Sequence, residues 1–293
     1  MKKAQPYFDP KVTKYPYPEY TDQHYLKVVE REHLVFDENY SYIDESKSFK
    51  FKRFWFNILL VTVMFPLTRI RMNLRIKGRE NLKKYRKILE NGAITVSNHV
   101  HMWDFPAMMF ALKEPSLKVL VWSKNLMGEN RKFIRMSGGI PVPVEDPAAM
   151  AAMYFSVVDY LRKGNWLHIY SEGSMWEFYQ PIRPFKDGAA RFSYACKKPI
   201  LPIAFTYRKN GFIREKIFNS PASLTINIGE PIQPDLDIPA NEGRKQLTIQ
   251  VHDAVCRLAG IDPVDNIYPP FFNNDKRVDY YTTEYGIGYK KSW

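Results

Sequence analysis

Residues 93–113 read AITVSNHVHMWDFPAMMFALK and have the pattern of a strand, a loop and a helix. Residues 93–97 are a short apolar run, which is typical of a strand buried in a sheet. Pro106 is suited to the first turn of a helix, so the helix is predicted to begin near Phe105. Asp104 would then be the N-cap of that helix, and the residues before it form the connecting loop.

The same alternation continues on both sides of this unit. Further strands are predicted at residues 74–76, 118–122, 140–144, 166–170, 200–207 and 223–228, and further helices at 130–136, 147–163, 188–197 and 241–259. Short apolar strands separated by helices indicate an α/β domain, in which a mostly buried mixed sheet is flanked by helices. We assign this domain to residues 72–260.

Three segments lie outside this domain. Residues 1–46 are rich in Tyr, Pro and charge and are predicted to form an N-terminal extension, and residues 261–293 an irregular, aromatic C-terminal tail. Residues 47–71 are predicted to form an amphipathic, interfacial helical segment. The basic start of the chain is not followed by an apolar stretch, so we expect no secretory leader. Cys196 and Cys256 cannot make a disulfide framework, which suits a reducing, cytosol-facing compartment.

The positive charge of the chain is concentrated around one apolar run. The formal net charge is +12, and residues 47–87 contain thirteen Lys or Arg against a single acid. Within this window, residues 54–67 form an apolar run of 14 residues, shorter than the roughly 20 that a membrane-spanning helix needs. A basic and aromatic segment of this kind favours the headgroup region of an anionic membrane surface. The alternative is a buried core helix that has basic ends.

The membrane interpretation specifies contact residues and a location. The predicted membrane contacts are Phe54, Trp55, Phe56, Lys52, Arg53, Arg69 and Arg71. A segment that lies on the bilayer predicts a peripheral or monotopic protein on the cytoplasmic face of the cell membrane. A nucleic-acid partner is not expected, because the sequence contains no recognisable nucleic-acid-binding module.

His99 and Asp104 are the candidate catalytic pair. In a continuous helix, residues five apart point in different directions, but a loop allows His99 to fold back onto the Asp104 carboxylate. A carboxylate bonded to one ring nitrogen fixes the tautomer and leaves the other nitrogen as a base for a hydroxyl. The alternative is that Asp104 only caps the helix and His99 is incidental.

Several sequence blocks, in order, resemble a known family. Asn98-His99 with Asp104 resembles the NHxxxxD signature of the glycerolipid acyltransferase superfamily, whose best-known members are the 1-acylglycerol-3-phosphate acyltransferases. The other matching blocks are GRENL at 78–82, GGIPV at 138–142, SEGS at 171–174, PFKDGAAR at 184–191 and KPILPI at 198–203. The resemblance covers roughly residues 72–230.

The resemblance implies a reaction and a set of site residues. An acyl thioester, on coenzyme A or acyl carrier protein, would donate its chain to the free hydroxyl of a lysophospholipid, most directly 1-acylglycerol-3-phosphate. His99 would be the general base and Asp104 its orienting partner, with no metal and no bound cofactor. The implied substrate-binding residues are Asn98, Glu172, Gly173, Ser174 and Lys186.

Two positions depart from the family pattern. Val144 and Met175 stand where the family has arginines that grip the phosphate of the acceptor. The cations that could bind the acceptor phosphate in place of these arginines are Lys124, Arg183, Lys186 and Arg191. Another lysolipid or a glycolipid is therefore an alternative acceptor, and a non-catalytic lipid-binding homologue is an alternative function. His101, two residues beyond His99, is a rival base.

Overall fold

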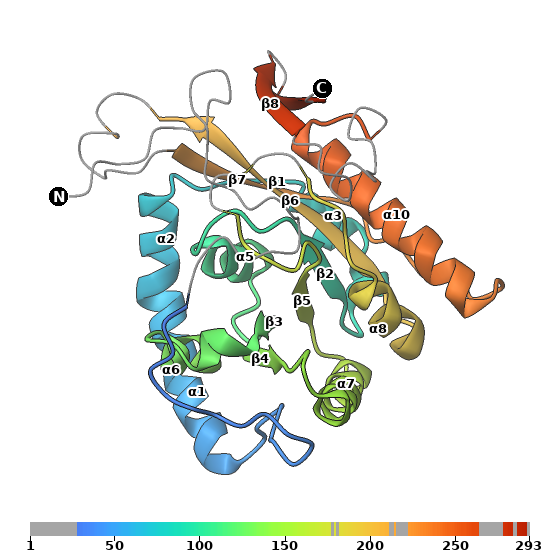
Figure 1. The fold of residues 1–293 in the computed structure, drawn as a ribbon. Coiled ribbons are helices and arrows are strands. Elements are labelled where there is room, and N and C mark those ends of the chain that lie inside the picture. The colour runs from blue at the N-terminus through green and yellow to red at the C-terminus, as the bar shows by residue number, and fades with distance from the viewer. Residues whose placement is uncertain are drawn as a thin grey trace.

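A seven-stranded sheet runs through the molecule in the order β1-β7-β6-β2-β5-β3-β4 (Figure 1). The computed structural model describes residues 28–176, 179, 182–210, 214, 222–263, 278–283 and 286–291. The strands of the sheet are β1 (Arg75–Lys77), β2 (Ile94–Ser97), β3 (Lys118–Trp122), β4 (Gly139–Val142), β5 (Leu167–Tyr170), β6 (Ile200–Lys209) and β7 (Ala222–Ile228). All neighbours are parallel except β6 and β7, which are antiparallel. The prediction of a mixed α/β sheet is confirmed.

Helices cover both faces of this sheet. They are α1 (Lys47–Leu59), η1 (Leu60–Met64), α2 (Phe65–Arg71), α3 (Glu80–Lys84), α4 (Arg86–Leu89), α5 (Asp104–Leu112), η2 (Ser123–Leu126), α6 (Arg131–Met136), α7 (Pro147–Arg162), α8 (Gly188–Cys196) and α10 (Ala240–Ala259). The short helices α3 and α4 were not expected from the sequence. The longer predicted helices all form, with ends that shift by at most one residue.

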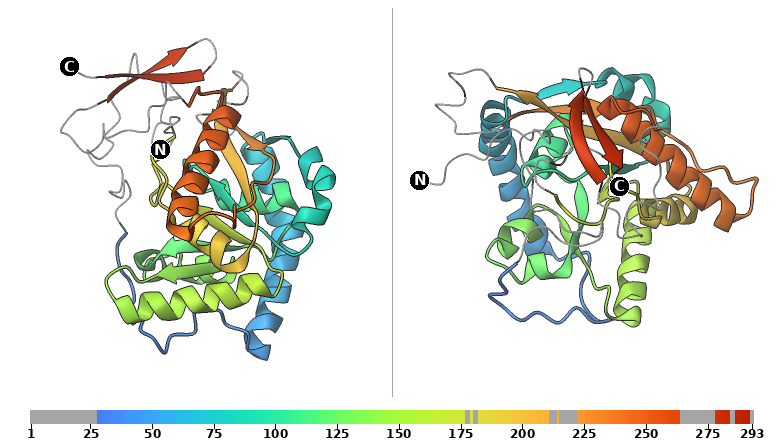
Figure 2. Two further views of the ribbon diagram at one scale, coloured as in Figure 1. Left: turned by 90° about the vertical axis from the view of Figure 1, so that its right-hand side faces the viewer. Right: turned by 45° about the horizontal axis from the view of Figure 1, so that its top comes forward.

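Two apolar clusters hold the layers together, one on each face of the sheet. Successive residues of β6 alternate between them, with Ile200 and Ala204 in one cluster and Leu201 and Ile203 in the other. Side chains of α7, α8 and α10 complete the first cluster, and those of α2 and α5 complete the second. The views in Figure 2 show α10 on the far side of the sheet from the blue N-terminal helix. β2 is buried along its whole length, as a central parallel strand should be.

The register of the central strands places the candidate site. Ser97, the last residue of β2, pairs with Tyr170, the last residue of β5. Because β2 and β5 are parallel, the loops that follow them leave the same edge of the sheet side by side. The first of these loops contains His99, and the second contains residues 171–174.

The apolar segment near the N-terminus forms one continuous helical stretch, Lys47–Arg71, of 25 residues. By length and composition alone it could cross a membrane. The core helix of a soluble protein or a signal sequence can have the same length and composition. The bounds of this stretch match the helical segment predicted at residues 47–71, because the helix continues beyond the 14-residue apolar run through the basic residues at both ends. Ser46 caps its start by accepting a hydrogen bond from Phe49 N at 3.2 Å.

One face of this helical stretch packs on the domain and the rest is exposed. Leu60, Phe65 and Thr68 are buried, and the π-helical turn η1, with its i→i+5 bonds, lets Leu60 and Phe65 face the same side. The large exposed side chains are Phe51, Phe54, Trp55, Ile58, Leu59, Val61, Val63, Leu67 and Ile70. The alternative of a buried core helix is therefore wrong.

Two predicted membrane contacts face the protein instead. Arg53 is 8% exposed, and its Nη2 donates to the carbonyl oxygens of Ser116 and Leu117. Phe56 packs edge-on against Phe133, with ring centroids 5.6 Å apart. Both belong to the inner face of α1, which a count of apolar residues does not distinguish from the outer face. Phe54, Trp55, Lys52, Arg69 and Arg71 are exposed.

The terminal segments are described only in part. Residues 1–27 of the predicted N-terminal extension lie outside the described residues. The C-terminal tail is not irregular throughout, because β8 (Val278–Thr283) and β9 (Gly286–Lys291) form an antiparallel two-stranded sheet. The absence of alternating hydrophobicity hid these strands. The predicted domain boundaries remain predictions.

Candidate active site

The His99 imidazole and the Asp104 carboxylate meet at the end of β2. His99 Nδ1 lies 3.2 Å from Asp104 Oδ2. The same oxygen accepts hydrogen bonds from the backbone N–H groups of Val100 and His101, each at 2.8 Å. The Asp104 side chain is fully buried, whereas that of His99 is 22% exposed. The loop therefore folds back as the sequence predicted.

This geometry fixes which nitrogen of His99 can act as a base. A carboxylate oxygen only accepts hydrogen bonds, so His99 Nδ1 must be the donor in this contact. Nδ1 therefore carries the ring proton and points it at Asp104. The lone pair is then on Nε2, at the other side of the ring. Asp104 is the first residue of α5, and Trp103 occupies the N-cap position, one residue earlier than predicted. A carboxylate in the first turn is stabilised by the helix dipole.

Tyr170 holds the plane of the His99 ring. The two rings are stacked, with centroids 3.7 Å apart and an interplanar angle of 15°. Burial, reinforced by the nearby charge of Asp104, raises the pKa of the Tyr170 hydroxyl well above its ordinary value, so the phenol stays neutral. Sequence reasoning missed this residue. Its signal is its place as the last residue of β5, next to the strand that leads into His99.

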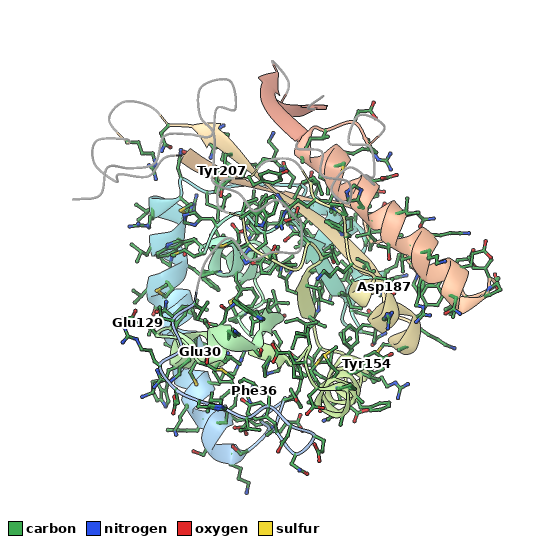
Figure 3. The ribbon with its side chains drawn as sticks, in the orientation of Figure 1. Glu30, Phe36, Glu129, Tyr154, Asp187 and Tyr207 are labelled. Atoms are coloured by element: carbon green, nitrogen blue, oxygen red, sulfur yellow. The ribbon has the colours of Figure 1, made fainter. Side chains whose placement is uncertain are left out.

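Asn98 braces the catalytic loop. It is fully buried, its Nδ2 donates to Phe205 O at 3.0 Å, and its Oδ1 accepts from Phe205 N at 2.8 Å. Tyr207, labelled in Figure 3, adds a second tie by donating from its hydroxyl to Val100 O at 3.0 Å. Both side-chain polar atoms of Asn98 thus bond to Phe205 of β6, and its contact with substrate stays a prediction.

Glu172 and Ser174 are likewise internal. Glu172 Oε2 accepts from His99 N at 3.0 Å, and Glu172 forms a salt bridge of 2.8 Å with Arg183 in which both side chains are 1% exposed. Glu172 Oε1 accepts from Arg183 N at 2.8 Å, and Ser174 Oγ accepts from Arg183 Nη1 at 2.7 Å. These buried groups connect the two loops and position the His99 backbone. The substrate contacts that the resemblance implies for Glu172 and Ser174 stay a prediction.

Gly173 and Lys186 lie together at the exposed rim of the second loop. Gly173 has a φ of +79°, a conformation that favours glycine, and an added Cβ would lie 3.0 Å from Lys186 Cε. The backbone N–H of Lys186 donates to Ser171 O at 2.8 Å, which draws this segment against the end of β5. Both residues are exposed. Of the five predicted substrate-binding residues, these two are placed where a substrate can reach them.

His101 is less suited than His99 to be the base. Its Nδ1 accepts a hydrogen bond from Trp103 N at 3.1 Å. Burial is the main cause that lowers the pKa of its imidazole, with smaller contributions from Arg71 and His99. His101 is therefore a neutral residue whose ring nitrogen helps to shape the loop.

A buried histidine that the sequence analysis did not single out lies beneath the site. His168, on β5, is fully buried, which lowers its pKa to about 3 and keeps it neutral. Its Nδ1 lies 2.8 Å from Thr95 Oγ1 and its Nε2 lies 3.3 Å from Ser97 Oγ. The Ser97 hydroxyl donates to Asn98 O at 2.8 Å, so this network ends at the catalytic loop. The only sequence signal is a histidine inside an apolar strand.

Three of the four cations that could replace the family arginines at the acceptor phosphate have acidic partners. Lys124 Nζ lies 3.6 Å from Glu30, and Arg191 Nε lies 2.8 Å from Asp187. Arg183 is buried against Glu172, and of the four only Lys186 remains at the site rim. Within the described parts of the chain, no three His, Cys, Asp or Glu side chains are grouped to hold a metal ion.

Comparison with known proteins agrees with this site. Residues 73–206, which include both loops, match the family model described as Acyltransferase. A 1-acyl-sn-glycerol-3-phosphate acyltransferase of Streptococcus pneumoniae is 26% identical over 222 residues, which cover 74% of this chain and 78% of that protein. Residues 73–206, the segment that carries both loops, are thus similar to the acyltransferase family.

Two further proteins are similar to this chain. An N-acylphosphatidylethanolamine synthase of Arabidopsis thaliana is 28% identical over 163 residues, which are 49% of this chain. The match spans 56% of that relative's own length. The crystal structure of a 1-acyl-sn-glycerophosphate acyltransferase from Thermotoga maritima aligns with a TM-score of 0.48 and 16% identity, covering 75% of this chain and 83% of that one.

Proposed function

We propose that the protein is an O-acyltransferase that transfers an acyl chain from a thioester to the free hydroxyl of 1-acylglycerol-3-phosphate, giving phosphatidic acid. The observation that carries this proposal is the His99 ring, which is held by Asp104 on one nitrogen and by Tyr170 on one face. The similarity to a 1-acyl-sn-glycerol-3-phosphate acyltransferase supports the choice of acceptor.

The proposed reaction uses His99 as a base and then as an acid. Nε2 removes the proton of the acceptor hydroxyl, and the oxygen attacks the thioester carbonyl to form a C–O bond. The tetrahedral intermediate collapses with cleavage of the C–S bond, and the thiolate takes the proton back from His99. Asp104 stabilises the imidazolium that exists between these steps. The thioester, on coenzyme A or acyl carrier protein, is a substrate, so the reaction needs no resident cofactor.

We further propose that the exposed face of Lys47–Arg71 rests in the headgroup region of the cytoplasmic leaflet. Its support is the set of apolar side chains that remain exposed there, among them Phe54 at 59% and Trp55 at 57%. Lys52 at one end and Arg69 and Arg71 at the other would contact anionic headgroups. A docked helix would bring the adjoining catalytic loop to the surface where lysolipids lie.

The decisive experiment measures thioester consumption by the purified protein with liposomes. Acyl-CoA and acyl carrier protein donors are each offered with 1-acylglycerol-3-phosphate and with other lysolipids. We expect transfer to 1-acylglycerol-3-phosphate, and a loss of at least about 100-fold in the variant His99→Gln. Unchanged unfolding temperature shows that the variant is folded. Full turnover by folded His99→Gln would overturn the mechanism, and no transfer to any acceptor would favour a non-catalytic lipid-binding protein.

A second candidate acceptor is the amine of phosphatidylethanolamine. The 28% identity to an N-acylphosphatidylethanolamine synthase favours this amine over a glycolipid hydroxyl. An amine must lose a proton to attack the thioester, and His99 is equally placed to take it. Including phosphatidylethanolamine in the acceptor panel separates the two proposals, because the products carry an amide in one case and an ester in the other.

A further inference from the structure

Arg71 lies against the catalytic loop although it belongs to a different element. It is in the last turn of α2, and its guanidinium carbon is 5.4 Å from the centroid of the Trp103 ring. Trp103 lies in the loop between His99 and Asp104, directly before α5. A guanidinium stacked on an indole face is held by cation–π attraction, and its N–H groups point outward along the edge. The cation is therefore anchored at the site, with its donors still available.

The charge of Arg71 acts on the catalytic loop without a counter-ion of its own. Arg71 is exposed, and among the described residues it forms no salt bridge. Its nearness to the loop is also visible in His101, whose pKa it helps to lower. The loop carboxylate, Asp104, is buried and already accepts from His99 and two backbone N–H groups. Within the described parts of the chain, the positive charge at this rim therefore has no acidic partner.

We propose that Arg71 binds the phosphate of the acceptor lysolipid, with Trp103 fixing its orientation. This rests on the proposed function and identifies the acceptor class as a lysolipid with a phosphate group. Arginine forms two parallel hydrogen bonds with phosphate oxygens, which suits it to this task better than lysine. In 1-acylglycerol-3-phosphate the phosphate and the reacting hydroxyl are on neighbouring carbon atoms. Arg71, on the rim of the loop that carries His99, would therefore bind the phosphate while the hydroxyl meets His99.

The position of Arg71 along the chain supports this role. It follows the exposed apolar side chains of Leu67 and Ile70, at the end of the helical stretch proposed to rest on the membrane. Met72 and Leu74, which follow it, pack on the domain. Arg71 therefore stands at the junction between the lipid-facing helix and the catalytic loop, where the headgroup of a membrane-held acceptor would enter.

The test uses a water-soluble acceptor so that membrane binding does not enter the result. The probe is 1-hexanoylglycerol-3-phosphate, with uncharged 1-hexanoylglycerol as its control, and binding is measured by calorimetry on the full chain. We expect Arg71→Gln to weaken binding of the phosphate compound at least tenfold, and Arg71→Lys to weaken it less. Binding of 1-hexanoylglycerol should be the same in the wild type and in both variants.

Arg75→Gln is the matched control variant. Arg75 is also exposed and lies four residues further on, so this variant loses the same charge away from the loop. It should bind the phosphate compound as the wild type does. Equal weakening by Arg75→Gln and Arg71→Gln, or no weakening by folded Arg71→Gln, would overturn the role of Arg71.

Turnover by the same variants distinguishes this inference from the proposed function. With 1-acylglycerol-3-phosphate in liposomes, Arg71→Gln should raise KM at least tenfold and leave kcat within about threefold. A wild type that binds the phosphate probe through Arg71 but transfers no acyl chain would overturn the proposed function and keep the phosphate site. A wild type that acylates only acceptors without phosphate would overturn the phosphate site and keep an acyltransferase.

Discussion

At the residue scale, the stacked Tyr170 ring is expected to set the efficiency of His99. Tyr170→Leu removes the flat surface under the imidazole, so kcat should fall about tenfold because small misplacement of a base is costly. Tyr170→Phe keeps the ring and should retain activity within about threefold. Equal damage by Phe and Leu would contradict the stacking role.

Tyr154→Leu is the matched control for this experiment. Tyr154, labelled on α7 in Figure 3, stacks on Phe192 with centroids 5.1 Å apart, far along the chain from His99. Its loss should lower the unfolding temperature but leave kcat unchanged.

The buried His168 predicts a loss of stability in acid. Its pKa is about 3 in the folded protein and near 6.5 when unfolded. As the pH falls from 6.5 toward 3, the unfolded chain takes up a proton that the folded protein refuses, so the free energy of unfolding decreases. This one residue contributes at most about 1.4 kcal/mol per pH unit. Urea unfolding of wild type and His168→Gln at pH 7 and pH 4.5 measures it, and equal acid sensitivity of the two proteins would contradict it.

The catalytic pair was predictable at this scale, but the roles of its neighbours were not. The spacing of His99 and Asp104 and the nearby Pro106 indicate a loop that turns back on a helix start. The partner of Asn98 is Phe205, 107 residues away, and the partner of Glu172 is Arg183 across a separate segment. A motif names the residue but not the long-range contact that uses its side chain. The motif therefore did not predict that Asn98, Glu172 and Ser174 are buried and bonded to other parts of the protein.

At the element scale, the exposed face of α1 should govern membrane affinity. The double change Phe54→Ser and Trp55→Ser removes two exposed aromatic side chains, so we expect affinity for anionic vesicles to fall at least tenfold. The unfolding temperature should stay the same, because neither side chain packs in the core. Vesicle sedimentation measures the effect. The control is Phe155→Ser, a side chain 63% exposed on α7, which should leave vesicle binding intact.

The strands and long helices were predictable as elements because each has a clear apolar pattern. The N-terminal helix was predictable as well, since its bounds, Lys47–Arg71, match the segment predicted at residues 47–71. The burial of Arg53 against backbone carbonyl oxygens was not, because a charged side chain at the end of an apolar run is expected on the surface. The GRENL block at 78–82 makes a long-range contact that the sequence does not predict. Asn81 Nδ2 donates to the carbonyl oxygens of Ile228 and Gly229, which ties α3 to the end of β7.

At the scale of the whole molecule, Lys118 makes stability depend on pH in the alkaline direction. It lies over the Tyr160 ring of α7. Burial, with the charges of Arg53 on α1 and Arg135 on α6, lowers its pKa to about 7 from an ordinary 10.5. Between these values the unfolded chain holds a proton that the folded protein has released, so the free energy of unfolding rises with pH.

Lys118→Met tests this dependence. Methionine needs no proton and fills a similar volume, so the variant should be the more stable protein at pH 7. The difference should shrink toward pH 10, as chemical unfolding at both pH values will show. A wild type that remains less stable by the same amount at pH 10 would contradict the prediction.

The order of the strands could not be derived from the sequence. β1 and β7 come from opposite ends of the domain, yet they form the edge of the sheet, and Asn73 Nδ2 donates to Ser223 Oγ across 150 residues of chain. Such pairing depends on packing between distant segments, which local patterns do not report. The sheet is mixed because β7 runs antiparallel to β6.

This distant pairing has a consequence for synthesis on the ribosome. The contact between the end of the N-terminal helix and β7 forms late. Leu224 N can donate to Met72 O only after the later strand has emerged from the ribosome. At roughly 5–20 residues per second, that interval is on the order of 10–30 s. Throughout it, Met72 at the end of the helix lacks its partner strand, and the outer apolar face of the helix is uncovered. The nascent chain therefore has time to meet a bilayer or a chaperone before its catalytic domain exists.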